Sequence, residues 1–388
     1  MKILWLIPFY APNRKVEISP KIFMLTKNNE IARSFREIGH KIKAVVSLNN
    51  QPINMDGFSD VCFFRTLKLG WIDKFLYHIK MLYVALNDEY DIALFSVHSS
   101  HLIPFLKIGS MTRGRRPFLV LDIRTVPVDL VNNFRSRFEL FRYNFSVKIA
   151  DLFCDGITCI TPMLGATLEP KLKKFRKKIG YFQTGVNFNL FDPSKSLSLK
   201  SSLGIENKFI VFYHGVLSPN RGLQNVIKAI DICRETISNI LFMIVGNGKA
   251  EPELKSITKE LDLLENVKFT GGIPFEIIPS YIATADVGII PLPAIDWWNV
   301  SSPIKLKEYL AMQLPVIATD IPAHRHVVEN TGGATLIKDN EPQNIAQAVL
   351  AFYKSRRTTY PMKTRKDLYG LISFNSQALK FIEYVNKL

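Results

Sequence analysis

Short apolar runs that alternate with helix-like spacing dominate the second half of the chain. Six β-rich runs lie at 209–213, 240–245, 267–270, 287–291, 315–319 and 334–337. Between them, apolar residues recur at helical spacing, as in 253–264. Strands that alternate with helices are typical of βαβ units, and therefore of a parallel sheet covered on both faces. We expect a doubly wound α/β domain from about Leu203 to about Ala351.

The first half repeats this pattern less cleanly. Its strand candidates lie at 3–7, 42–46, 93–97, 118–121 and 156–160, with helical segments such as 30–38 and 74–86 between them. The Ser- and Lys-rich stretch 193–203 lacks apolar periodicity and is typical of a linker. We therefore predict two Rossmann-like doubly wound parallel-sheet domains, over 1–195 and 196–371, with a helix over 372–388 that can pack back onto the first. Such domains face a central cleft, where ligands bind beyond the carboxyl ends of the strands.

Charge adds a preference for anionic partners. The 388 residues contain 50 Lys and Arg against 34 Asp and Glu, a net charge of +16, while 47% of them are hydrophobic and 22% charged. These are globular values, so a disordered basic tail does not explain the charge. Nucleic acid, phosphorylated small molecules and an acidic membrane surface all stay open as partners.

We expect neither a secretory signal nor a disulfide framework in this sequence. The apolar run that begins in Met1–Tyr10 is short, because Pro8 and Pro12 interrupt it. The sequence has no uninterrupted apolar stretch of ~18 residues. Four cysteines, with no Cys-x-x-Cys pair among them, are typical of reduced thiols. We expect a cytoplasmic protein without a membrane-spanning helix.

The segment Ser301–Ala311 predicts a helix start that suits a phosphate. Ser302 is the expected N-cap and Pro303 the expected first helical residue, just after the predicted strand 287–291. Free amides and Lys305 in the first turn would attract an anion, and Glu308 on the same face could accept hydrogen bonds from ribose hydroxyls. Spacing alone favours an ordinary i, i+3 salt bridge between the two.

A second candidate anion site follows the predicted strand 209–213. The loop 213–222 (YHGVLSPNRG) leads into a helix near Gly222, and Arg221 would offer a bidentate donor to a diphosphate. A cation at a helix start is unfavourable unless an anion is near, which favours a functional role. The Gly-x-Gly in 244–248 (IVGNG) is a weak signal, because a tight turn also explains it.

Two enzyme classes find no support. The first strand is followed by FYAPN rather than by the glycine pattern of a dinucleotide-binding enzyme, and the chain contains no Asp-x-Asp for a metal-bound nucleotide. We expect neither a cofactor nor a metal.

Taken in order, these motifs resemble the family-four retaining glycosyltransferases, which have the two-domain GT-B arrangement. The resemblance runs from YHGVLSPNRG through IVGNG, NVKFTGGIP, YIATADVGIIPL and SSPIKLKEYLAMQLPVIATD to Gly332 and Gly333. It is preceded by GYFQTGVNFNLFDP over 180–193. Each piece is weak, but their order across some 200 residues is specific to the family.

The resemblance implies roles for individual residues. Arg221 and Lys305 would contact the donor diphosphate and Glu308 the ribose, and Asp122 is a further catalytic candidate. The other expected substrate-binding residues are His214, Gly215, Gly246, Asn247, Ser302, Pro303, Ile304 and Arg124. Val216 and Val300 depart from the family, which often has a basic residue and a glutamate there. Asp122-Ile123-Arg124 stands where many members place a histidine near the donor sugar.

The implied reaction moves a hexosyl group from a UDP- or GDP-linked donor to a lipid-linked or polysaccharide acceptor, with retention and without a metal. Cations and helix amides at the diphosphate would stabilise the charge that develops on the leaving group more than they stabilise the ground state. An inverting or phosphorylase-type enzyme of the same architecture is a rival. Further alternatives are an inactive nucleotide-sugar-binding protein and, weakest, a basic nucleic-acid-binding protein.

Two basic segments of the first half are candidates for a membrane surface. Over 133–148, phenylalanines 134, 138, 141 and 145 share one helical face, and the spacing favours a stripe buried in the core over one that lies in a membrane interface. Over 171–178 (KLKKFRKK), a solvated surface explains the charge only slightly better than contact with acidic lipid does. The expected membrane residues are Lys171, Lys173, Lys174, Arg176, Lys177 and Lys178, which would place the protein on the inner face of the membrane. No RNA- or DNA-binding signature accompanies these segments, so we do not expect nucleic acid as a partner.

Overall fold

The chain folds into two compact units. The computed structural model describes residues 1–10, 20–48, 55–65, 71–114, 116–127, 134–175 and 178–388. Unit 1 consists of Met1–Thr184 and Phe374–Leu388, and unit 2 of Gly185–Ser373. The sequence placed the division after residue 195. Residues 185–195 group with unit 2 because the Arg365 guanidinium donates hydrogen bonds of 2.6 Å and 2.8 Å to the carbonyl oxygens of Phe188 and Phe191.

The expected linker 193–203 also packs onto unit 2. The Leu199 amide donates a 2.7 Å hydrogen bond to the Thr284 hydroxyl, and the Lys200 ammonium lies 3.3 Å from the Asp286 carboxylate. Sequence composition alone could not show these tertiary contacts. The chain passes between the units after Thr184 and again after Ser373.

Unit 1 contains a parallel seven-stranded sheet in the order β3-β2-β1-β4-β5-β6-β7, which confirms the doubly wound fold. Its strands are β1 (Lys2–Tyr10), β2 (Lys41–Leu48), β3 (Asp60–Arg65), β4 (Ile92–Phe95), β5 (Phe118–Ile123), β6 (Gly156–Cys159) and β7 (Gly180–Tyr181). The two edge strands, β3 and β7, were not predicted. β3 (DVCFFR) is apolar at its centre, but none of its described residues is buried, and β7 spans two residues, so neither carries a buried apolar run.

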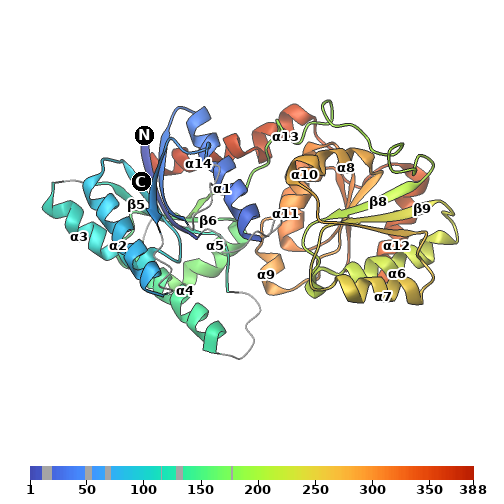
Figure 1. Cartoon of the computed structure of the whole chain (residues 1–388), viewed down its shortest axis with the longest axis horizontal. Coiled ribbons are helices and arrows are strands. Elements are labelled where there is room, and N and C mark those ends of the chain that lie inside the picture. Colours follow the sequence, from blue (N-terminus) through green and yellow to red (C-terminus); the bar gives the residue numbers. More distant parts are fainter. Residues whose placement is uncertain (11–19, 49–54, 66–70, 115, 128–133, 176–177) are drawn as a thin grey trace. The chain divides into compact units, whose positions relative to one another are not determined.

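Helices cover both faces of this sheet (Figure 1). They are α1 (Pro20–Glu37), α2 (Trp71–Asn87), α3 (Ile103–Thr112), α4 (Phe134–Phe153), α5 (Pro162–Leu168) and α14 (Phe374–Val385). α1 packs against α14, and α3 packs against both α2 and α4. Phe381 of α14 lies in the core, with its ring 5.5 Å from that of Phe35 and 5.0 Å from that of Phe182.

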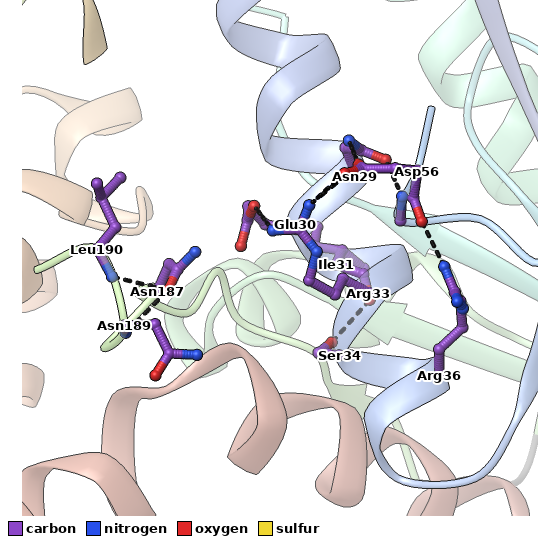
Figure 2. Close-up of polar contacts among 11 residues, drawn as sticks. Asn29, Glu30, Ile31, Arg33, Ser34, Arg36, Asp56, Asn187, Asn189 and Leu190 are labelled. Atoms are coloured by element: carbon purple, nitrogen blue, oxygen red, sulfur yellow. Dashed lines mark hydrogen bonds and ion pairs between the residues drawn. The ribbon is translucent and has the colours of Figure 1, made fainter. Parts of the chain in front are cut away.

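A polar network holds the segment before β3 on α1, as Figure 2 shows. The buried Asn29 amide donates to an Asp56 carboxylate oxygen at 2.6 Å and accepts from the Gly57 amide at 2.6 Å. Arg33 donates to both Asp56 oxygens at 3.0 Å, and Arg36 donates to the Asp56 carbonyl. A side chain at Gly57 would collide with the Asn29 backbone, since its Cβ would stand 2.0 Å from that carbonyl oxygen.

Unit 2 contains a second parallel sheet, of six strands, in the order β10-β9-β8-β11-β12-β13. The strands are β8 (Phe209–His214), β9 (Ile240–Val245), β10 (Val267–Gly271), β11 (Val287–Ile290), β12 (Val316–Thr319) and β13 (Ala334–Ile337), each within a residue or two of its predicted bounds. The helices are α6 (Leu223–Arg234), α7 (Glu251–Glu260), α8 (Ile278–Thr284), α9 (Asp296–Asn299), α10 (Ile304–Ala311), α11 (Pro322–Thr331), α12 (Pro342–Ser355) and α13 (Arg365–Ile372). α6, α7 and α12 form one group in Figure 1, with α6 packed against both others.

Candidate functional site

Two glycine turns meet beyond the carboxyl ends of the neighbouring strands β8 and β9. Gly215 follows β8 with φ +127°, and Gly246 follows β9 with φ +138°. The Gly215 amide donates to the Val245 carbonyl at 2.8 Å, and a Cβ at Gly246 would stand 2.0 Å from the Gly215 carbonyl oxygen. Both turns therefore need glycine, for backbone conformation and for close approach. The sequence had treated the second turn as a weak signal, since contact between the turns is a tertiary feature.

Lys305 lies directly against the first of these turns. A Cβ added to Gly215 would stand 2.3 Å from Cε and 2.8 Å from Nζ of Lys305. The Nζ atom also lies 5.5 Å from the centre of the Tyr213 ring. Burial and the neighbouring positive charge of Arg221 hold the pKa of Lys305 well below its usual value, against the opposing effect of Glu308. An anion between Lys305 and Arg221 would relieve their repulsion.

Arg221 is held in place from two sides. It ends the short 3₁₀ turn Pro219–Arg221, just before Gly222 and α6. Its Nε atom donates to the Ser218 hydroxyl at 3.2 Å, and its guanidinium lies 5.0 Å from the centre of the Trp298 ring. The Trp298 indole N–H in turn donates to the Asn220 carbonyl at 3.0 Å. Stacking and hydrogen bonding together orient a planar cation, which suits a diphosphate.

Glu308 pairs with His214 at the end of β8. The Glu308 Oε2 and His214 Nε2 atoms are 3.2 Å apart, and both residues are buried. The His214 amide donates to the Tyr309 hydroxyl at 3.2 Å, and the two rings meet edge to face at 5.3 Å. The structure thus brings Glu308, expected from sequence, to His214 and places both beside the Lys305 turn.

The predicted cap of the Lys305 helix is wrong in detail. α10 begins at Ile304 with Pro303 as its N-cap, and no side chain caps it. The Ser302 hydroxyl instead lies 3.4 Å from the ammonium of Lys307, a fully buried lysine. Because Ser302 does not occupy the first amides of α10, the helix start keeps the donor groups that an anion needs.

The remaining expected substrate-binding residues of unit 2 line the same loops. Asn247 is exposed in the turn after β9, and its carbonyl accepts a 2.9 Å hydrogen bond from the Leu217 amide. Pro303 is buried and Ile304 half-buried at the start of α10. Val216 is exposed beside Gly215.

Asp122 and Arg124 form a separate cluster in unit 1, at the end of β5. The Asp122 side chain is inaccessible to solvent, accepts from Arg124 Nε at 2.6 Å and accepts from the Thr158 hydroxyl at 2.8 Å. Arg124 also stacks 4.6 Å from the centre of the Phe182 ring. With its two oxygens engaged by Arg124 and Thr158, Asp122 has the geometry of a positioning residue for Arg124.

The basic run after α5 is exposed where it is described. Lys171, Lys173, Lys174 and Lys178 are exposed, whereas Arg176 and Lys177 lie outside the described residues. The Lys174 and Phe175 amides donate to one Asp151 oxygen of α4, both at 2.7 Å, and the Lys171 ammonium lies 5.3 Å from the Tyr143 ring. The backbone of the run is therefore hydrogen-bonded to α4.

The preference for a buried phenylalanine stripe on α4 is overturned. Phe138, Phe141 and Phe145 are 51%, 64% and 44% exposed, while Tyr143, Val147 and Ala150 are buried. The Phe134 side chain lies outside the described residues. Helical spacing shows that residues share a face, but not which face packs against the sheet.

Trp298 and Tyr309 are site residues that sequence reasoning missed. Both act through contacts with residues distant in sequence, Trp298 with Arg221 and Tyr309 with His214. The adjacent tryptophans at 297–298, just before the SSP motif, were the available signal. Among the described residues, no cluster of three or more His, Cys, Asp and Glu side chains suits a metal ion. No helix in the described ranges has the length and apolarity needed to cross a bilayer.

Comparison with curated proteins finds glycosyltransferases. The chain is 26% identical over 206 residues to the putative teichuronic acid biosynthesis glycosyltransferase TuaH of Bacillus subtilis, covering 52% of this chain and 49% of that protein. It is 30% identical over 109 residues to a GDP-mannose-dependent phosphatidylinositol monomannoside mannosyltransferase of Mycolicibacterium smegmatis, covering 28% of each. The chain thus spans about half the length, or less, of these relatives.

Solved structures share the fold over the whole chain. The Anabaena protein HepE in complex with UDP has a TM-score of 0.73 at 19% identity, covering 100% of both chains. Sucrose-phosphate synthase from Thermosynechococcus elongatus has a TM-score of 0.71 at 14% identity, covering 100% of this chain and 99% of that one. At such identities the likeness establishes the fold, the GT-B fold expected from sequence. The family model of the glycosyl transferases group 1 matches residues 196–369, which lie in the second unit, so that this unit is similar to the glycosyl transferases of that group.

Proposed function

We propose that the protein transfers a hexosyl group from a nucleoside-diphosphate sugar to a lipid-linked or polysaccharide acceptor, with retention at the anomeric carbon. One observation carries the donor half of this proposal. Lys305 lies against the glycine turn at Gly215, and burial together with the nearby positive charge of Arg221 disfavours its protonated form, which a bound anion would stabilise. Such an arrangement favours a diphosphate over a neutral ligand.

Each site residue then has a task in the transfer. The two cations and the first amides of α10 neutralise the negative charge that grows on the leaving diphosphate as its bond to the anomeric carbon breaks. Glu308, oriented by His214, accepts hydrogen bonds from the ribose hydroxyls through its second oxygen. For retention, the acceptor attacks from the side of the leaving group, and the departing phosphate takes the acceptor's proton.

Similar proteins support the class of donor and acceptor. HepE was solved with UDP, and the mycobacterial relative is named for GDP-mannose and a phosphatidylinositol mannoside. We propose a UDP- or GDP-linked donor on this basis. TuaH, together with the putative colanic acid glycosyltransferase WcaL of Escherichia coli, supports a polysaccharide or glycolipid product.

Turnover with a panel of nucleotide sugars tests the proposal. We expect nucleotide release with one donor, stimulated by a lipid-linked or glycan acceptor, and at least a hundredfold loss of turnover, in line with the loss of one transition-state donor, in Lys305→Ala. Glu308→Gln should weaken donor binding and turnover together. Lys259→Ala, an exposed lysine on α7, is the matched control. Unchanged turnover in Lys305→Ala and Glu308→Gln would reject the site, and an inverted anomeric product would reject retention.

An inactive nucleotide-sugar-binding protein is the second candidate. Val216 is 47% exposed in the diphosphate loop, where a cation would add to transition-state stabilisation. Tight donor binding with no turnover for any acceptor would favour this reading, and Val216→Lys would then be the variant to examine for gained turnover.

We also propose that the basic run 171–178 meets anionic lipid at the inner face of a membrane, where a lipid-linked acceptor would lie. Its described lysines are exposed, and its backbone is anchored on Asp151 of α4. Neutralising Lys171, Lys173, Lys174 and Lys178 to Gln should reduce co-sedimentation with anionic liposomes. No change would reject this contact.

A further inference from the structure

An apolar surface covers the helices α2, α3 and α4 of unit 1. In the part of the chain that the structure describes, 12 of the 23 exposed large apolar side chains lie on these three helices. They are Trp71, Phe75, Ile79 and Tyr83 on α2, Phe105, Ile108 and Met111 on α3, and Phe138, Leu140, Phe141, Phe145 and Leu152 on α4. We call this set the α2–α4 apolar face.

The arrangement is regular on α2, and the three helices are neighbours. On α2 the four residues recur every fourth position, which places them along one side of the helix. α3 packs between α2 and α4, and the three helices lie together in Figure 1. Exposure is high at Trp71 (76%), Phe141 (64%) and Met111 (64%). For comparison, the described residues of helices α6 to α13 in unit 2 expose two large apolar side chains, Ile232 and Tyr369.

Most of the net positive charge of the protein lies in unit 1, the unit that carries the α2–α4 apolar face. Unit 1 contains 30 Lys and Arg against 16 Asp and Glu, a net charge of +14, whereas unit 2 contains 20 against 18, a net charge of +2. Exposed cations stand on the same helices at Lys74, Arg137 and Lys148, and the basic run 171–178 is fastened to α4.

The acidic residues of these helices do not offset the cations at the surface. The three helices hold three carboxylates. Asp73 is buried, Glu139 is bound to Arg142, and Asp151 accepts the amides of Lys174 and Phe175. The surface therefore combines exposed apolar side chains with exposed cations.

We infer that the α2–α4 apolar face is a membrane-docking surface that inserts its aromatic and aliphatic side chains into the interface of an anionic bilayer. This inference rests on the proposed function, and it gives unit 1 a hydrophobic membrane anchor in addition to the basic run. Aromatic side chains favour the level of the lipid headgroups, and exposed cations on the same helices attract anionic lipid. The charge complementarity selects lipid over two other occupants. A second copy would bring two strongly positive units together, and nucleic acid would gain little from Ile79, Ile108, Met111 and Leu152.

Vesicle flotation of the full chain tests the inference. The probes are vesicles of phosphatidylcholine alone and of phosphatidylcholine with phosphatidylglycerol, at low and at high salt. We expect binding to the anionic vesicles, weakened but not abolished by salt. Trp71→Ser with Phe75→Ser, and separately Phe141→Ser with Phe145→Ser, should each lower the partition coefficient about tenfold or more. The matched control is Ile232→Ser with Tyr369→Ser on unit 2.

Three results would overturn the inference. They are no binding to either vesicle, binding that the serine variants leave unchanged, and a dimer in solution that the same variants dissociate. Donor binding at unit 2, measured by calorimetry without vesicles, is expected to be equal in wild type and serine variants. Far-UV circular dichroism and thermal unfolding of the full chain, unchanged from wild type, show that unit 1 of the variants is folded. Because that measurement reads the donor site alone, failure of membrane docking and failure of the proposed transferase function are distinguishable.

Discussion

The side chain of Lys305 occupies the space in which a Cβ of Gly215 would stand, with Cε only 2.3 Å from that position. Gly215→Ala should therefore push Lys305 away from the diphosphate loop and weaken nucleotide binding by roughly tenfold or more. Isothermal titration with the donor measures this. Gly204→Ala controls for backbone strain, because Gly204 also has a positive φ, +64°, but nothing lies within 4 Å of its Cβ position. Equal affinity in the Gly215 and Gly204 variants would contradict the steric argument.

Donor binding is expected to take up a proton at Lys305. Burial and Arg221 lower the pKa of Lys305 well below its usual value, and a bound diphosphate should raise the pKa again. Affinity should then fall as the pH rises through the lowered pKa. Calorimetry at mildly alkaline pH, in two buffers of different ionisation enthalpy, counts the protons. The uptake should vanish in Lys305→Met and persist in Lys259→Met. Full uptake in Lys305→Met would assign the proton to another group.

The stack of Arg221 on Trp298 should contribute to donor affinity by orientation. Trp298→Leu removes the ring face and the indole hydrogen bond to the Asn220 carbonyl. We expect donor affinity to fall about fivefold, in line with roughly 1 kcal/mol for a partly desolvated cation–π contact. The neighbouring half-buried Trp297, replaced by Leu, is the matched control. If the two variants lose the same affinity, general loosening of α9 is the cause.

The buried His324 should make the protein less stable in mild acid. Burial lowers the pKa of this histidine from 6.5 to about 4, while its Nδ1 atom lies 2.8 Å from the Thr319 carbonyl oxygen. In the unfolded chain His324 binds a proton below pH 6.5, whereas in the folded chain it binds one only below about pH 4. The free energy of unfolding should thus fall as the pH drops through this window, by about 3 kcal/mol in all.

Chemical denaturation followed by tryptophan fluorescence, at a series of pH values, measures this slope. In His324→Asn the slope between pH 6.5 and 4 should be shallower by that one proton, whatever the variant's absolute stability. Above pH 6.5 the slopes of variant and wild type should coincide. Identical slopes below pH 6.5 would show that His324 does not cause the loss.

Sequence predicted the strands of unit 2 closely because buried parallel strands are continuous apolar runs, such as Ile240–Val245. Arg221, Lys305 and Glu308 were named as candidates from sequence because each lies near a predicted strand end or helix start, and the family resemblance gave them their expected roles. Trp298 was not found, because its contact with Arg221 spans 77 positions of the chain. The Ser302 cap failed because α10 begins at Ile304, with Pro303 as its N-cap, and the Ser302 hydroxyl faces the Lys307 ammonium five residues on instead of a helix amide.

The chain crosses between the units twice, and this has a consequence during synthesis. α14 supplies Ala378, Phe381 and Val385 to the core of unit 1, yet the ribosome makes it after all of unit 2. Part of the core of unit 1 therefore stays exposed to solvent until α14 has been made. Unit 2 is continuous from Gly185 to Ser373 and can fold as soon as it emerges. Unit 1, although begun first, can complete its core only after unit 2 has been synthesised.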